Sequence, residues 1–123
     1  SYGQGGAGSS RGGGGGAGGV GSNPTGGAGK SSSITGSAVT YATGGTGNNN
    51  ATGAANTGNG GGSNSSNGQP GLAGGSGIVI LKWATADATI GATRTGLTDG
   101  GVQTSGSDSY IVFTAGTGTV TFS

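Results

Sequence analysis

Side chains able to do chemistry are few in this chain of 123 residues. It has no His and no Cys, and its formal net charge is +1. Acid–base catalysis, covalent catalysis and zinc binding rely mainly on imidazole, thiolate or paired carboxylate groups. The carboxylates Asp87, Asp99 and Asp108 are spread too widely along the chain to indicate a catalytic pair. We therefore expect no enzyme, no cofactor and no metal site.

The basic residues are equally sparse. Arg11, Lys30, Lys82 and Arg94 do not form the basic stripe that neutralises nucleic-acid phosphates, so we expect no nucleic-acid partner. No apolar run approaches the roughly 18 residues of a membrane-spanning helix, so we expect no membrane insertion. The sequence begins with Ser1 inside a glycine-rich tract, which favours a piece of a longer polypeptide or a processed product.

Glycine and large apolar residues divide the chain into two parts. Of the 36 glycines, 29 lie in residues 1–77 and seven in residues 78–123. Large apolar residues show the reverse distribution, with six in the first part and fourteen in the second. We expect a glycine-rich domain at 1–77 and a β-rich module at 78–123. A module of this size rarely stabilises itself by one core, so we expect a neighbour to support it.

The second part predicts antiparallel β-structure. The β-branched and aromatic run at 77–83 favours a buried strand, and Asp99-Gly100 within 98–102 indicates a hairpin turn. Alternation in 110–114 and 119–122 predicts a second hairpin closed by 115–118. The residues expected in the core or in assembly contacts are Ile78, Ile80, Trp83, Ile111, Phe113, Val120 and Phe122.

The glycine-rich part allows two physical interpretations. Apart from 33–43, where Val39 and Tyr41 alternate and a strand or an extended rung is expected, it offers little apolar surface to bury. Composition alone favours a flexible linker. The competing hypothesis is a packed array of polyglycine II helices, which are extended, left-handed and have three residues per turn. Glycine lets their backbones approach closely and bond to one another, with the C-terminal β-module as a clamp.

Four segments carry a resemblance to a known family. Residues 12–19, 26–37, 40–47 and 74–83 resemble the glycine-rich domain of phage tail-fibre and receptor-binding (adhesin) proteins, and 113–122 is similar to a short β-module often appended to it. Members of that family usually begin with an apolar strand before the first glycine run. This chain starts after that point, so we expect the strand upstream in a longer protein or from a neighbouring subunit.

The resemblance implies a fold and a function. The expected fold class is mainly β, with polyglycine-II-like extended helices packed with a small antiparallel β-module at the C-terminus and almost no α-helix. The expected function is a non-enzymatic structural or adhesin module of a tail fibre on the virion surface, or otherwise extracellular. Its partner would be a bacterial surface glycan or outer-membrane protein, bound through polar loop tips. The candidate receptor-binding residues are Asn48, Asn49, Asn50, Thr52, Ser63, Asn64 and Asn67.

A second function remains open from the sequence. Exposed edge strands such as 78–83 or 119–122 would join neighbouring copies into an extracellular or virion filament. Both hypotheses predict a homo-oligomer, either a trimer or a filament.

Overall fold

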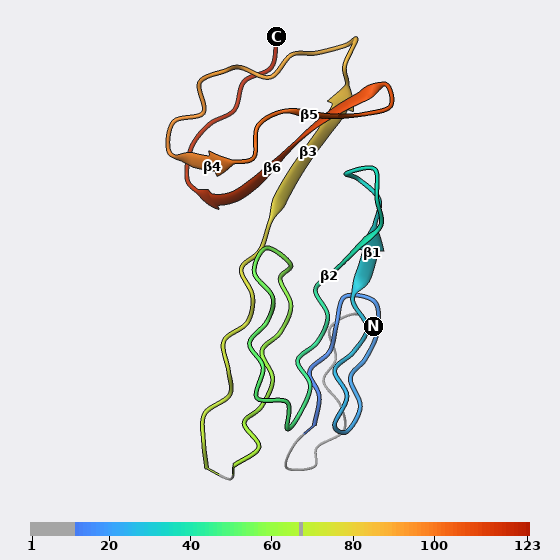
Figure 1. Ribbon diagram of the computed structural model, residues 1–123, viewed down its shortest axis with the longest axis vertical. Helices are drawn as coiled ribbons and strands as arrows, with labels where there is room; N and C mark the ends of the chain where they lie inside the picture. The colour runs from blue at the N-terminus through green and yellow to red at the C-terminus, as the bar shows by residue number, and fades with distance from the viewer. Residues whose placement is uncertain (1–11, 67) are drawn as a thin grey trace. The chain divides into compact units, whose positions relative to one another are not determined.

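A computed structural model describes residues 12–66 and 68–123 and shows a mainly β protein (Figure 1). Within these residues there are two sheets and no helix. The chain separates into two compact units. Among the described residues, unit 1 comprises 12–32 and Val39–Gly77 without residue 67, and unit 2 comprises Ser33–Ala38 and Ile78–Ser123. No helix long and apolar enough to span a membrane occurs in the described part of the chain.

Two short strands form the first sheet. β1 (Lys30–Ser32) and β2 (Val39–Tyr41) pair antiparallel, with Lys30 opposite Tyr41 and Ser32 opposite Val39. The strand expected across 33–43 is therefore present only at 39–41. Residues 33–38 form the hairpin tip instead, because Gly36 turns the chain at a φ of 92° and its N–H donates to the Ser33 carbonyl at 2.9 Å.

The rest of unit 1 consists of segments joined by backbone hydrogen bonds. Between Tyr41 and Val79 the described residues contain neither helix nor strand. Successive bonds between two segments recur every third residue, whereas a β-strand repeats every second residue. The donor–acceptor pairs that show this are Gly14–Gly45 with Ala17–Ala42, Gly44–Gly27 with Gly47–Pro24, Gly60–Thr43 with Ser63–Thr46, and Leu72–Gly62 with Gly75–Asn59.

Among the described residues of unit 1, only glycines are buried. They are Gly13, Gly16, Gly21, Gly27, Gly47 and Gly62. The neighbouring backbone is so near several glycines that an added Cβ would overlap a carbonyl group of another segment. Gly45 meets Gly61 in this way, and Gly26 meets Gly44. These close approaches are possible because glycine has no side chain.

The sheet of unit 2 is built around one long strand. β6 (Asp108–Gly116) pairs antiparallel with β3 (Val79–Ala84) on one edge. On its other edge it pairs with β4 (Leu97–Asp99) near one end and β5 (Gln103–Ser105) near the other (Figure 1). The strand expected at 77–83 is thus confirmed, shifted slightly along the chain, but its expected burial is wrong, because β3 lies at an edge of the sheet and Val79 is 58% exposed.

The expected hairpin turn at 98–102 is wrong. β4 and β5 lie along the same edge of β6, and the chain between them forms an irregularity in the ladder, where the Gly100 N–H donates to the Val112 carbonyl at 3.2 Å. The hairpin turn lies after β5, because Ser105 and Asp108 are partners and two residues separate them. Gly106, at a φ of 64°, takes the first turn position, where type II′ turns require glycine.

The expected hairpin between 110–114 and 119–122 is also wrong. Both edges of β6 are already occupied, and the strand continues to Gly116 instead of turning after Thr114. The tail pairs instead with the connection between β3 and β4. Phe122 forms a bridge with Ile90, and the Thr89 and Ser123 backbones exchange hydrogen bonds of 2.9 and 3.0 Å.

The hydrophobic core of unit 2 lies on one face of this sheet. Ile111 is fully buried, Phe113 and Ile90 are 8% and 6% exposed, and all three belong to one cluster. The partly buried residues packed against it are Leu81, Trp83, Leu97 and Val120. Ser109, on the same face of β6, is buried too, and its hydroxyl is hydrogen-bonded to Thr85 Oγ1 at 2.7 Å.

Candidate functional site

Two polar segments, predicted separately as receptor-binding tips, lie together in unit 1. The Asn48 backbone N–H donates to Ser63 Oγ at 2.8 Å, and the Asn50 N–H donates to the Ser63 carbonyl at 3.3 Å. The Gly62 N–H donates to the Ala51 carbonyl at 2.8 Å and continues the contact. The segments around Asn48–Thr52 and Ser63–Ser66 therefore form one composite turn region, which we call the polar tip.

A pair of side chains closes the polar tip. The carboxamide of Asn50 accepts a hydrogen bond from the Ser65 N–H at 2.8 Å and donates one to Ser65 Oγ at 2.7 Å. Asn50 and Asn48 have positive φ values of 49° and 58°, a conformation that Asn tolerates better than most residues. The positive φ of both residues serves the turn, and the carboxamide of Asn50 serves it as well.

The remaining predicted tip residues differ in their surroundings. Asn49 and Thr52 are exposed, and their side chains have no hydrogen-bond partner within the described residues. Asn64 is half-buried and uses its side-chain oxygen to accept the Ser66 N–H at 3.0 Å, which forms a local turn. Asn67 lies outside the described residues.

A second asparagine–serine contact was not expected from the sequence. The Asn56 N–H donates to Ser76 Oγ at 2.9 Å, and the Ser76 hydroxyl donates to the Asn56 side-chain oxygen at 3.1 Å. Asn56 also has a positive φ, of 59°. No local sequence pattern could predict this contact, because the two residues lie far apart in the sequence. The positive φ alone could have been expected, because Asn in a turn often adopts the left-handed conformation.

The polar tip belongs to a long stretch of chain that has no charged side chain. Residues 43–77 contain no Asp, Glu, Lys or Arg and no aromatic residue, and Leu72 is their one large apolar residue. The polar groups of the tip are therefore carboxamides, hydroxyls and backbone groups. Such a surface can form hydrogen bonds with a ligand but cannot neutralise a charge.

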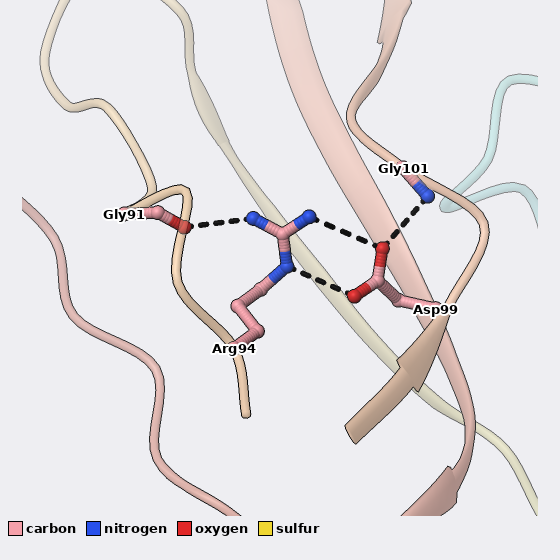
Figure 2. A network of polar contacts seen from close by, with 4 residues as sticks. All are labelled: Gly91, Arg94, Asp99 and Gly101. Atoms are coloured by element: carbon pink, nitrogen blue, oxygen red, sulfur yellow. Dashed lines mark hydrogen bonds and ion pairs between the residues drawn. The ribbon is translucent and has the colours of Figure 1, made fainter. Parts of the chain in front are cut away.

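The strongest charge pair lies in unit 2. Arg94 Nε and Nη2 donate to the two carboxylate oxygens of Asp99 at 2.9 and 3.2 Å, and Arg94 Nη1 donates to the Gly91 carbonyl at 2.7 Å (Figure 2). The Gly101 N–H adds a bond of 2.8 Å to Asp99 Oδ1. Their side chains are only 16% and 13% exposed. Each of the three guanidinium nitrogens of Arg94 donates to a partner in this network.

This geometry shifts both pKa values in the direction that favours the ion pair. The hydrogen bond from Arg94 lowers the pKa of Asp99, and the Gly101 N–H lowers it further. The hydrogen bond to Asp99 raises the pKa of Arg94. The pair joins the β3–β4 connection to the end of β4, so we assign it a structural role.

The residues expected in the core or in assembly contacts differ in their burial. Ile111 and Phe113 are buried in the core, and Trp83 and Val120 pack against it. Ile78 and Ile80 are half-buried outside that cluster. Phe122 is 44% exposed, yet its ring meets Trp83 edge to face with centroids 5.2 Å apart. Ile90 was missed by the sequence analysis because it stands alone among small residues.

Comparison with known proteins assigns no function to this site. No family model, no curated protein and no solved structure matches the chain. Within the described residues there is no group of His, Cys, Asp and Glu side chains that would hold a metal ion.

Proposed function

We propose that unit 1 is a packed array of polyglycine II helices. A helix with three residues per turn directs successive residues toward three neighbours, so bonds to any one neighbour recur every third residue. The hydrogen bonds of Gly14 and Ala17 to one segment, with those of Gly13 and Gly16 to another, follow that rule. The observation that carries the proposal is that, among the described residues of unit 1, glycine alone fills the buried positions.

Amide hydrogen exchange distinguishes this array from a flexible linker. In the array, the N–H groups of Gly14, Gly44 and Gly60 donate to other segments and should exchange slowly. The N–H groups of Gly15 and Gly74 donate to no described residue and serve as internal controls. Slow exchange at the first three positions and fast exchange at the controls supports the array. Uniformly fast exchange would show a linker.

We propose further that the chain is a non-enzymatic adhesin module of a phage tail fibre or a similar virion surface fibre. Two arguments support this function. The order of glycine runs and the closing apolar strand resemble the glycine-rich domain of such proteins. The polar tip places exposed carboxamide and hydroxyl groups on a hydrogen-bonded frame, as a rigid recognition surface requires.

Binding to bacteria tests the attachment function. The full chain, fluorescently labelled, is incubated with a panel of bacterial strains, and cell-bound fluorescence is measured by flow cytometry. An adhesin should bind a subset of strains saturably, and unlabelled chain should compete. Binding to none of the strains, or equal unsaturable binding to all of them, would refute the function.

One observation favours the alternative of a structural filament. β3 lies at an edge of its sheet and pairs only with β6 in the described part of the chain, and Val79 on it is 58% exposed. An apolar edge strand can accept a strand from another copy. Analytical ultracentrifugation of the full chain and of Val79→Lys tests this. Assembly that disappears in the variant supports the filament, whereas a closed trimer unaffected by it favours the adhesin.

A further inference from the structure

We infer that the polar tip binds a neutral glycan, and that its residues divide into those that hold the turn and those that contact the sugar. This inference rests on the proposed attachment function and specifies its ligand class and contact residues. Asn50, Ser63 and Ser65 hold the turn. The side chains of Asn48, Asn49 and Thr52 form the contact surface.

The holding residues use their hydrogen-bonding groups within the turn. Both functional atoms of the Asn50 carboxamide are bound to Ser65, at 2.8 and 2.7 Å. Ser63 accepts from Asn48 through its hydroxyl at 2.8 Å and from Asn50 through its carbonyl at 3.3 Å. Loss of these bonds should therefore disturb the turn. They restrict the backbone that carries the neighbouring side chains, which lowers the entropy lost on binding.

The contact residues have the opposite character. Asn48, Asn49 and Thr52 are exposed, and their side-chain oxygen and nitrogen atoms bond to no described residue. Asn48 is attached to the frame only through its backbone N–H, so its carboxamide stays available. Two carboxamides and one hydroxyl supply both donors and acceptors. That combination suits vicinal sugar hydroxyls, each of which donates and accepts.

The absence of charge in residues 43–77 selects the kind of glycan. An anionic polysaccharide bound here would lose hydration around its charges and find no Lys or Arg in exchange, which disfavours it. A protein ligand usually requires aromatic or aliphatic anchors, and this stretch contains only Leu72. Neutral sugars, recognised by hydrogen bonds, are the ligand class that the tip fits.

Treatment of bound cells tests the ligand class. A strain that binds the labelled full chain is treated either with periodate, which cleaves vicinal diols, or with proteinase K. A neutral glycan ligand predicts binding lost after periodate and retained after proteinase K. The reverse result would overturn the glycan inference and leave the attachment function standing. Absence of binding to any untreated strain would overturn both. Retained binding in competition with soluble anionic polysaccharide is expected, and its complete displacement would contradict the neutral ligand.

Matched variants test the division of roles. Asn49→Ala and Thr52→Ala should each weaken the apparent affinity for untreated cells about threefold to tenfold, as loss of one hydrogen bond does, without changing the unfolding temperature. Asn50→Ala should lower both the affinity for untreated cells and the unfolding temperature. Asn56→Ala removes the hydrogen bond that the Ser76 hydroxyl donates to the Asn56 side-chain oxygen and keeps the bond from the Asn56 backbone N–H to Ser76 Oγ; it should lower the unfolding temperature alone. Unchanged affinity in Asn49→Ala and Thr52→Ala would refute this assignment of the tip, whatever the cells bind.

Discussion

Gly45 and Gly61 lie against each other so closely that a methyl group on Gly45 would overlap the Gly61 carbonyl. The obstacle is backbone and cannot rotate away. Gly45→Ala should therefore destabilise unit 1 by about 1–3 kcal/mol, the usual range for overpacking. Amide exchange of Gly44 and Gly60, which donate to other segments, measures the effect.

Gly71→Ala is the matched control for this substitution. A Cβ at Gly71 would meet only the Gly62 carbonyl oxygen at 3.8 Å, an ordinary contact. Because alanine restricts the unfolded chain, this variant should be neutral or more stable by about 0.4–1 kcal/mol. Equal losses in Gly45→Ala and Gly71→Ala would contradict the close packing of these segments.

The core of unit 2 depends on a single fully buried side chain. Ile111 on β6 is completely inaccessible, so Ile111→Ala should cost about 2–5 kcal/mol. Val79 on β3 is 58% exposed, and Val79→Ala should change stability by less than about 0.5 kcal/mol. Denaturant unfolding followed by Trp83 fluorescence compares the two, and a similar loss in both would show that the core lies elsewhere.

Acid should weaken the Arg94–Asp99 pair. The folded-state pKa of Asp99 is lowered, so its stabilising contribution is complete above the unfolded pKa of about 3.9 and is lost as pH falls below that value through the folded pKa. Arg94 stays charged throughout. Thermal unfolding between pH 7 and pH 2 should show a loss of stability below about pH 4 that Asp99→Asn reduces.

The control for the acid experiment is the other ion pair. Lys82 Nζ and Asp108 Oδ2 are 3.0 Å apart, with side chains 30% and 36% exposed. A pair this open to solvent contributes about 0–1 kcal/mol, so Asp108→Asn should change the free energy of unfolding at pH 7 by no more than that. If Asp108→Asn reduces the loss of stability at low pH more than Asp99→Asn does, the Arg94–Asp99 pair is not the cause of that loss.

Within unit 2, Phe122 packs the C-terminal tail, residues 117–123, against β3. Its ring packs edge to face on Trp83 with an interplanar angle of 75°. Phe122→Ala should cost about 0.5–1.5 kcal/mol and shift the Trp83 emission to longer wavelength, because water then reaches the indole. Thr119→Ala, an exposed position of the same tail, should do neither. An unshifted emission in Phe122→Ala would place the ring away from Trp83.

Local patterns predicted β3 and the change from a glycine-rich to an apolar sequence after Gly77, but they did not predict the pairing of strands. Alternation in 110–114 and 119–122 shows which side chains share a face, whereas it carries no information about which strand lies alongside. The tail therefore pairs near Ile90, against expectation. Likewise, Asp99-Gly100 is compatible with a turn or with an irregularity within a ladder, and distant contacts with β6 decided between them.

For the polar tip, the sequence indicated the segments but not the roles of their residues. Asn48, Asn50 and Ser63 were expected to bind a receptor, and the structure engages the side chains of Asn50 and Ser63 in the turn itself. Composition could not reveal this, because an asparagine that holds a turn and one that binds a ligand look alike until their distant partners are known.

The burial of glycine in place of hydrocarbon has a thermal consequence. Exposing apolar surface raises the heat capacity of unfolding, and exposing peptide groups lowers it. The buried positions among the described residues of unit 1 are glycines, so the heat-capacity increment of this unit per residue should fall below the ~12–15 cal/mol/K of ordinary domains. A small increment makes the stability curve nearly straight, without the decline that ordinary domains suffer on cooling. Unit 1 should therefore gain stability steadily down to the freezing point.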